Sequence, residues 1–421
     1  MTTELATLLG EAAQTARFDT RPVKGLTATR LRHMYERSED HWDRKGLAGA
    51  QAHFSADHQA ALESLLRTLL DHYIADDLIG NGFSYLVTGY SVIPVSDLAR
   101  ACVTATALLG SEQVVHRLNK WTRGDAVPFR TCATVSGIDI DGPVDLGGGM
   151  RLETLPVLLT PLPIGAHAPG PREVKLTVER EGGPPFYNPE SRPEREDAWG
   201  GRPEPLIDAL CGALSLALDY SVTRRLSWSE CDEIQGFNLT MGMSWQTAPD
   251  ILSLDVSSPL STEQAAEVEG LLQKRQAHES ADLAMAIRRW VRSKAQTDIA
   301  DQFIELRIAL EALFLKDSIG ESRFRVSSRA AWYLGQSLEE RIGHQKTISA
   351  AYDVASRAVH TGAVKNAEEH RELLGAAQSF VRSAIVKRLD EADEPDWGKL
   401  VLGGDPPAAS VPRSPSEPDT R

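Results

Sequence analysis

The chain of 421 residues is long enough for two or three domains, and its 42% hydrophobic and 25% charged residues are ordinary for a globular protein. Its formal net charge of −14 excludes nucleic-acid binding by a surface that is positively charged all over, because phosphate binding requires clustered Lys and Arg. The N-terminus has no basic run before an apolar one, and no apolar stretch could span a bilayer, so we expect a cytoplasmic protein without a membrane partner.

Side chains that commonly form metal or covalent catalytic sites show no matching pattern. The four cysteines are scattered without a Cys-x-x-Cys pair, which is typical of buried free thiols. Four histidines lie in the first 60 residues, but none belongs to a His-Glu-x-x-His arrangement. Ser91, Ser227 and Ser229 lack a Gly-x-Ser-x-Gly elbow. We therefore expect no metal, no cofactor and no serine nucleophile.

Residues 1–130 are predicted to be mainly helical. Apolar residues recur at helical spacing from Leu62 to Tyr73 and from Leu98 to Leu109, and Ser96 is a favourable N-cap for the second helix. Between these helices, Phe83 to Val95 is rich in aromatic and β-branched residues, which favours a strand.

Residues 131–260 are predicted to be rich in β-structure. Extended patterns run through Val135 to Ile140, Val174 to Val178 and Phe237 to Val256, and a buried helix covers Leu206 to Ala217. Residues 163–205 contain many Pro and Gly residues and are predicted to be mostly loop. The triplet at residues 147–149 lacks the Lys-Ser/Thr of a phosphate loop, so it predicts a tight hairpin turn and not a nucleotide site.

Residues 261–395 are predicted to form a helical bundle, which makes the fold class α+β. Helix starts are indicated near Thr262, at Asp298, at the capping box beginning with Ser337 and at Asn366. An apolar seam that requires a partner helix is formed by Ile299, Phe303, Leu306, Leu310 and Leu313. We expect part of this seam to pair two copies of the chain. Residues 396–421 are predicted to be a disordered tail because they are rich in Pro, Ser and Gly.

One helix of this bundle carries a polar face. Asp353, Arg357 and His360 are spaced by four and three residues, so they share a side, opposite a stripe of Ile348, Tyr352, Ala355 and Val359. Thr361-Gly362 predicts the end of the helix, where the helix dipole favours a protonated imidazole. The simplest interpretation is structural, with an Asp353–Arg357 ion pair and a histidine on the last turn.

The segment from Arg323-Phe324-Arg325 to the Val359-His360 pair, with the preceding helix through Glu311 and Phe314, resembles the C-terminal domain of Apea-like HEPN proteins. The family motif ends in Arg-Ser-x-x-Val-His, and Ala355 stands here where the family has its arginine. The resemblance covers about the last third of the chain.

This resemblance implies an RNA-directed function, with a role in prokaryotic stress or antiphage defence. His360 would act as the base and Arg357 as the cation of a metal-independent endoribonuclease, across a homodimer. Arg341, Lys346 and Lys365 would contact phosphates, and residues 281–393 are nearly balanced in charge, with 17 Lys and Arg against 16 Asp and Glu. The alternative is a catalytically inactive HEPN module that pairs subunits while the N-terminal region senses a ligand or partner.

Overall fold

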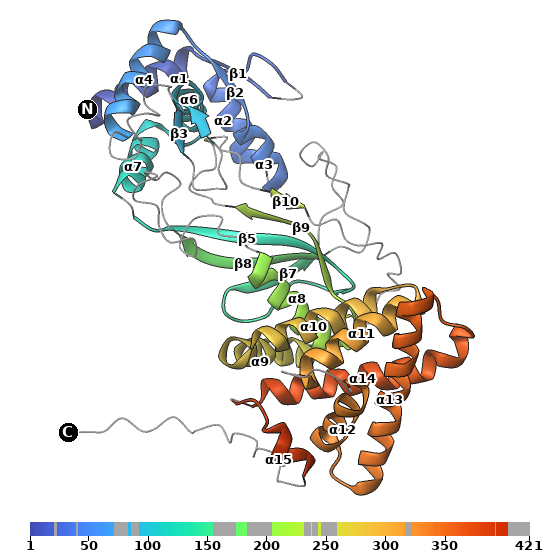
Figure 1. Cartoon of the computed structure of the whole chain (residues 1–421). Coiled ribbons are helices and arrows are strands. Elements are labelled where there is room, and N and C mark those ends of the chain that lie inside the picture. The colour runs from blue at the N-terminus through green and yellow to red at the C-terminus, as the bar shows by residue number, and fades with distance from the viewer. Residues whose placement is uncertain are drawn as a thin grey trace, which may run out of the picture.

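The protein has an α+β fold in which two groups of helices flank a central sheet (Figure 1). The computed structural model describes residues 1–20, 23–38, 41–70, 83–85, 92–123, 125–154, 174–182, 204–230, 237, 243–245, 259–315, 322–391 and 393–402. The N-terminal helices lie at one end of the view, the sheet lies in the middle, and the C-terminal helices lie at the other end.

The N-terminal part is a helical cluster with two small two-stranded antiparallel sheets. Its elements are α1 (Thr2–Thr15), β1 (Arg17–Asp19), α2 (Ala28–Arg37), α3 (His41–Ala48), β2 (Gln51–His53), α4 (Ala56–Leu70), β3 (Phe83–Tyr85), β4 (Val92–Pro94), α6 (Val95–Leu109) and α7 (Ser111–Thr122). Helix α6 lies at the centre, because nearly all of its residues are buried. The largest buried side chain of this core is that of Trp121, which contacts the Phe237 ring at a centroid distance of 4.9 Å.

The predicted N-terminal helices are confirmed, with one shifted start. Leu62 and Leu66 are buried on α4, as their spacing predicts. Helix α6 begins at Val95 after Pro94, so Ser96 lies inside the first turn and is not the N-cap. The strand predicted over Phe83 to Val95 corresponds to the antiparallel pair β3 and β4, and the residues between them lie outside the described part.

The central sheet is antiparallel and its strand order is β10-β9-β5-β8-β7-β6. The strands are β5 (Val127–Ser136), β6 (Val144–Asp145), β7 (Met150–Thr154), β8 (Val174–Gly182), β9 (Thr223–Glu230) and β10 (Met243–Trp245). Apolar residues of β5, β7 and β8, among them Ala133, Leu152 and Leu176, are buried in one core with α8 (Glu204–Leu218). The extended pattern at Val174 to Val178 is therefore confirmed, but the one at Val135 to Ile140 is only partly right, because β5 begins at Val127 and ends at Ser136. Most of the Pro/Gly-rich segment and most of Phe237 to Val256 lie outside the described residues.

The glycine triplet forms the predicted turn, between β6 and β7. All three glycines have positive φ values, of 79°, 57° and 75° for Gly147, Gly148 and Gly149. A Cβ at Gly147 would lie 2.7 Å from the Glu269 carboxylate of helix α9 (Thr262–His278), at the end of a flexible, exposed side chain. Glycine is favoured here for its backbone conformation.

The C-terminal part consists of helices that share one hydrophobic core with α8 and the sheet. These elements are α9 (Thr262–His278), α10 (Ala281–Ala295), α11 (Ile299–Phe314), α12 (Ser322–Leu334), α13 (Leu338–Thr361), a 3-10 turn at Ala367–His370, α14 (Arg371–Leu389) and α15 (Trp397–Val401). Side-chain caps account for several of the starts. Ser261 and Ser337 each form a complete capping box, and the Asp298 carboxylate accepts the Ala300 and Asp301 amides.

The predicted helix start at Asn366 needs correction. Asn366 has a positive φ of 53° and makes no side-chain cap, although its amide donates to Glu369 at 3.1 Å. A 3-10 turn follows it, and α14 begins only at Arg371.

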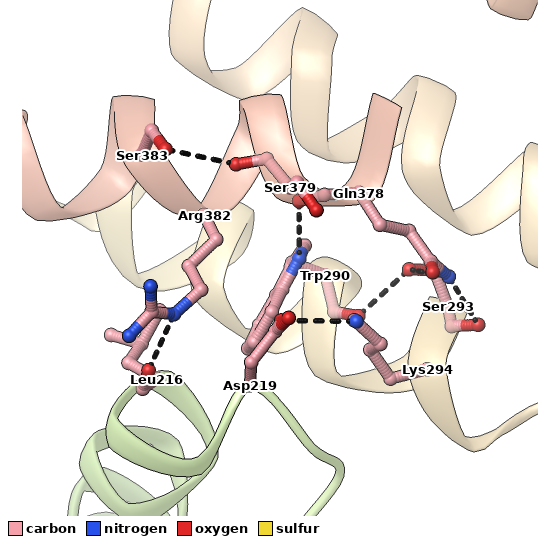
Figure 2. Close-up of polar contacts among 9 residues, drawn as sticks. All are labelled: Leu216, Asp219, Trp290, Ser293, Lys294, Gln378, Ser379, Arg382 and Ser383. Atoms are coloured by element: carbon pink, nitrogen blue, oxygen red, sulfur yellow. Dashed lines mark hydrogen bonds and ion pairs between the residues drawn. The ribbon is translucent and has the colours of Figure 1, made fainter. Parts of the chain in front are cut away.

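Polar contacts join α8 to the C-terminal helices (Figure 2). The Trp290 indole donates to the Gln378 carbonyl at 2.9 Å, and the Gln378 amide donates to the Ser293 carbonyl at 3.2 Å, which ties α10 to α14. The Arg382 guanidinium donates to the Leu216 carbonyl at 2.6 Å, and Lys294 pairs with Asp219 at 3.0 Å. The end of α8 is thus held by both α10 and α14.

The apolar seam of α11 packs inside the subunit. Phe303, Leu306, Leu310 and Leu313 are all buried, mainly against α10, α13 and α14. The prediction that this seam pairs two copies of the chain is therefore wrong, because its side chains are already covered by the chain's own helices.

The prediction that the disordered tail starts at residue 396 is also wrong, because the first residues of that range form α15. Trp397 and Leu400 are buried, and the Trp397 ring contacts the rings of Phe314 and Tyr333 at centroid distances of 5.5 and 5.7 Å. A large aromatic side chain buries much apolar area, so it can dock a short segment when a second apolar residue such as Leu400 is buried with it. The folded body therefore includes residues beyond Asp396.

Replacing Trp397 by Ala should lower the free energy of unfolding by about 3 to 5 kcal/mol, because it empties a buried aromatic site. Leu402→Ala is the matched control, since Leu402 is 88% exposed, and should change it by less than about 0.5 kcal/mol. Urea unfolding followed by circular dichroism measures both. Equal stability of the two variants would show that α15 does not dock.

Gly212→Ala should also destabilise the protein, by about 1 to 3 kcal/mol. A Cβ there would lie 2.2 Å from Nη1 of Arg275, a buried side chain that donates to the Ala209 carbonyl at 2.7 Å and pairs with Glu279. Gly375→Ala is the control, because that helical position has no neighbour within 4 Å and alanine should stabilise it by up to about 1 kcal/mol. Thermal unfolding in which both variants shift alike would contradict the packing of α9 on α8.

Candidate functional site

Helix α13 has one buried and one exposed side along most of its length. Ile348, Tyr352 and Ala355 are buried, as their spacing predicts. Val359 is 54% exposed, so its assignment to the buried stripe is wrong. Ala358 is the buried residue on the last turn instead. The buried side contacts α11, α12 and α14.

The predicted end of α13 is confirmed. Thr361 is the last helical residue, and Gly362 adopts the left-handed conformation with φ 70° while its amide donates to the Ala358 carbonyl at 2.8 Å. His360 and Arg357 are both exposed on this last turn. They lie three residues apart and are therefore neighbours on the helix surface.

Lys346 lies on the same side of α13. It precedes Arg357 by eleven residues. Over eleven residues a helix makes about three turns, so the two side chains point within about 20° of the same direction and are about 16 Å apart along the helix axis. We call Lys346, Ala350, Asp353, Arg357 and His360 the polar face of α13. Within the described part of the chain, the side chains of Lys346, Arg357 and His360 make no hydrogen bond or ion pair.

The other two predicted phosphate contacts differ from each other. Lys365 is exposed in the turn after α13, close in sequence to His360. Arg341 is half-buried, because its guanidinium lies 3.7 Å from the Trp332 ring centroid and donates to the Gly335 carbonyl at 3.0 Å. Arg341 thus holds the start of α13 against α12, and it is not on the polar face.

The single acid on the polar face is paired, but not with Arg357. The Arg323 guanidinium at the start of α12 donates to both Asp353 carboxylate oxygens, at 2.9 and 3.0 Å. The predicted Asp353–Arg357 ion pair is therefore replaced by a contact between two helices. As a result, the charge of Asp353 is balanced by Arg323, and the Arg357 side chain is available to contact a ligand.

Ala355 cannot contribute to the exposed surface, because it is only 1% exposed and faces the bundle core. It stands at the position of the arginine in the HEPN motif that the sequence resembles. The only arginine on the last two turns of α13 is Arg357.

A second polar cluster lies beside Asp353, between α11 and α13. The Tyr352 hydroxyl donates to Glu311 Oε1 at 2.5 Å, and Arg307 Nε donates to the same oxygen at 2.8 Å. The Arg307 guanidinium also lies 4.5 Å from the Tyr352 ring centroid. The cluster holds the Tyr352 ring in the core, and one edge of this ring lies near the surface.

The cluster shifts the acid–base properties of two members. Burial, followed by the hydrogen bond and charge of Glu311, raises the pKa of Tyr352. Burial alone would lower the pKa of Arg307, but the contacts with Glu311 and Tyr352 outweigh it and raise the pKa. Tyr352 therefore stays neutral and Arg307 stays charged at physiological pH.

Next to this cluster is an open depression of about 690 Å³, lined by Ser322, Arg323, Phe324 and Tyr352. Its volume falls within the range of small-molecule pockets, about 300 to 1,000 Å³. Phe324 is 62% exposed, although it is a large aromatic residue. The sequence did not predict a site at these four residues, and the signal that could have indicated one is Glu311, an acid within an apolar helix seam.

Other classes of site are not apparent in the described residues. Cys102, Cys132 and Cys211 are buried and free, and burial, with the nearby Asp208 carboxylate, raises the pKa of Cys211 to about 12. No three His, Cys, Asp or Glu side chains within the described ranges gather in a way that could hold a metal ion. None of the described helices is both long enough and apolar enough to cross a membrane.

Comparisons of the chain with protein-family models, with curated proteins and with solved structures found no match.

Ala355→Arg should lower the free energy of unfolding by about 3 to 5 kcal/mol, because the new guanidinium would be buried without a partner. Ala350→Arg is the control on the same helix, since Ala350 is exposed on the polar face, and should change stability by less than about 0.5 kcal/mol. Urea unfolding of both variants tests which side of α13 faces the core. An Ala355→Arg protein as stable as its control would show that this position reaches the surface.

Proposed function

We propose that the polar face of α13 binds RNA, with Lys346 and Arg357 contacting phosphates and His360 lying beside the bound backbone. The observation that carries this proposal is that these three side chains share one exposed helix side without partners among the described residues. A cation that has no partner in the protein can contact a phosphate, and the counterions condensed on the nucleic acid are released on binding.

The surroundings support this assignment in a chain of net charge −14. Asp353, the only acid on the polar face, already accepts two hydrogen bonds from Arg323. Lys365 adds a further exposed cation next to the end of the helix. The face therefore keeps a local positive charge although the whole protein is acidic.

The same residues have the chemistry for RNA cleavage without metal. His360 would remove the proton from a ribose 2′-hydroxyl, whose oxygen then attacks the adjacent phosphorus. Arg357 would stabilise the charge that develops on the phosphate oxygens. The P–O5′ bond breaks, leaving a 2′,3′-cyclic phosphate and a 5′-hydroxyl that takes up a proton. The resemblance to HEPN proteins and their role in prokaryotic stress or antiphage defence agrees with this chemistry.

The second candidate is an interaction module that binds without cleaving. The observation that favours it is Ala355, whose buried methyl group supplies no cation at the position where the HEPN motif has one. In that case the bundle would pair with a partner or with a second copy while the N-terminal helices sense a ligand. A homodimer is part of both candidates, through a surface other than the buried α11 seam.

Reversing two charges tests the binding. Lys346→Glu with Arg357→Glu should weaken binding to single-stranded RNA at least tenfold and reduce the slope of log affinity against log salt by about 1.4, or about 0.7 per phosphate contact. Lys24→Glu, an exposed lysine in the N-terminal part, is the control and should change neither quantity. Filter binding at several salt concentrations measures both. An unchanged salt slope in the double variant would rule out the polar face as the phosphate-binding site.

Cleavage is tested separately, with total RNA and an excess of chelator. Wild type should produce 2′,3′-cyclic phosphate ends, and His360→Ala and Arg357→Ala should each slow this by about a hundredfold or more. RNA binding without any cleavage by wild type would favour the interaction module. Equal cleavage by wild type and His360→Ala would rule out this histidine as the base.

A further inference from the structure

We propose that the depression at the start of α12 is a subsite for one unpaired nucleobase, which stacks on the Phe324 ring. This inference rests on the proposed function, because the base belongs to the RNA strand whose phosphates contact the polar face of α13.

The lining has the chemistry that recognises a flat, uncharged ring. Phe324 is 62% exposed, so its aromatic ring is open to solvent, and the planar guanidinium of Arg323 lines the same depression. The Ser322 hydroxyl forms a hydrogen bond with Tyr352 and helps to hold that ring in place. Aromatic rings and arginine planes are the usual stacking partners of unpaired bases. Tyr352 closes the inner wall of the depression, and its ring is held there by Glu311 and Arg307.

The charges around the depression favour a base over a phosphate. Arg323 is paired with Asp353, and Arg307 is paired with Glu311, so each cation is matched by a carboxylate. The pairing with Asp353 also fixes the Arg323 guanidinium, which lowers the entropy cost of stacking against it. Cations without such partners lie instead on the polar face, at Lys346 and Arg357.

The depression and the polar face are adjacent through one contact. Asp353 belongs to the polar face, and the Arg323 that binds it lines the depression. Along α13, His360 lies eight residues beyond Tyr352, a rise of about 12 Å. A single strand can therefore place one base on Phe324 while its backbone runs along Arg357 towards His360. A duplex, whose bases are already stacked and paired, cannot do so.

The test uses the full chain and a short single-stranded RNA that contains 2-aminopurine, whose fluorescence is quenched by stacking. Wild type should quench it, and Phe324→Ala should lose the quenching and bind the strand about tenfold more weakly. Phe324→Leu, which keeps an apolar side chain but has no ring, should resemble Phe324→Ala, whereas Phe324→Trp should restore both. Leu338→Ala is the matched control, because Leu338 is 74% exposed in the first turn of α13.

Salt dependence separates the two proposals. Phe324→Ala should leave the salt slope unchanged and should not weaken binding to fully duplex RNA, whereas Lys346→Glu with Arg357→Glu should lower the slope. If only the charge variant weakens binding, the base subsite is wrong and the phosphate face stands. If Phe324→Leu binds and quenches as wild type does, stacking on this ring is excluded. If only the Phe324 variants lose binding, the subsite stands and the polar face of α13 fails.

Discussion

The burial of one side of α13 is the constraint on which the candidate site depends. Ile348, Tyr352 and Ala355 are buried on the side of α13 that contacts α11, α12 and α14, and burying such side chains contributes about 1.5 to 3 kcal/mol for each large one. A rotation of the helix about its axis would expose these residues and bury Lys346 and Arg357. The apolar contacts therefore decide which side chains face solvent, and the positive charge at the surface follows from the packing underneath.

The same packing separates two kinds of polar surface. At the depression between α12 and α13, the Arg323 cation is matched with the Asp353 carboxylate and lies beside the exposed Phe324 ring. Lys346 and Arg357, which lie before and after Asp353 on α13, have no such partners within the described chain. A ligand that carries both flat neutral rings and a charged backbone fits this division, and single-stranded RNA is such a ligand. The proposed function and the base subsite are thus two consequences of one arrangement.

Much of the fold could be predicted from the sequence because its signals are local. The caps at Asp298 and Ser337, the helix start near Thr262 and the glycine stop at Gly362 depend on residues within one turn of the chain, and the structure confirms each of them. The turn at Gly147 is equally local. The exposure of Arg357 and His360 follows from helical periodicity alone.

The features that sequence reasoning missed depend on contacts between distant residues. Asp353 is bound by Arg323, thirty residues earlier, and not by the arginine four residues later on its own helix. The α11 seam is covered by helices of the same subunit, so periodicity alone could not identify its partner. The segment around α15 folds because the Trp397 ring contacts the rings of Phe314 and Tyr333 and Leu400 is buried beside it. Composition and spacing show that an apolar face needs a partner, but they do not specify which one.

The most direct test of RNA binding by α13 is ultraviolet cross-linking of a uniformly labelled single-stranded RNA to the full chain, followed by mass spectrometry of the linked peptides. The account predicts cross-links in the peptide that contains Phe324 and in the peptides of α13 that contain Lys346 and His360. Cross-links confined to residues 1–260, with none in α12 or α13, would contradict it.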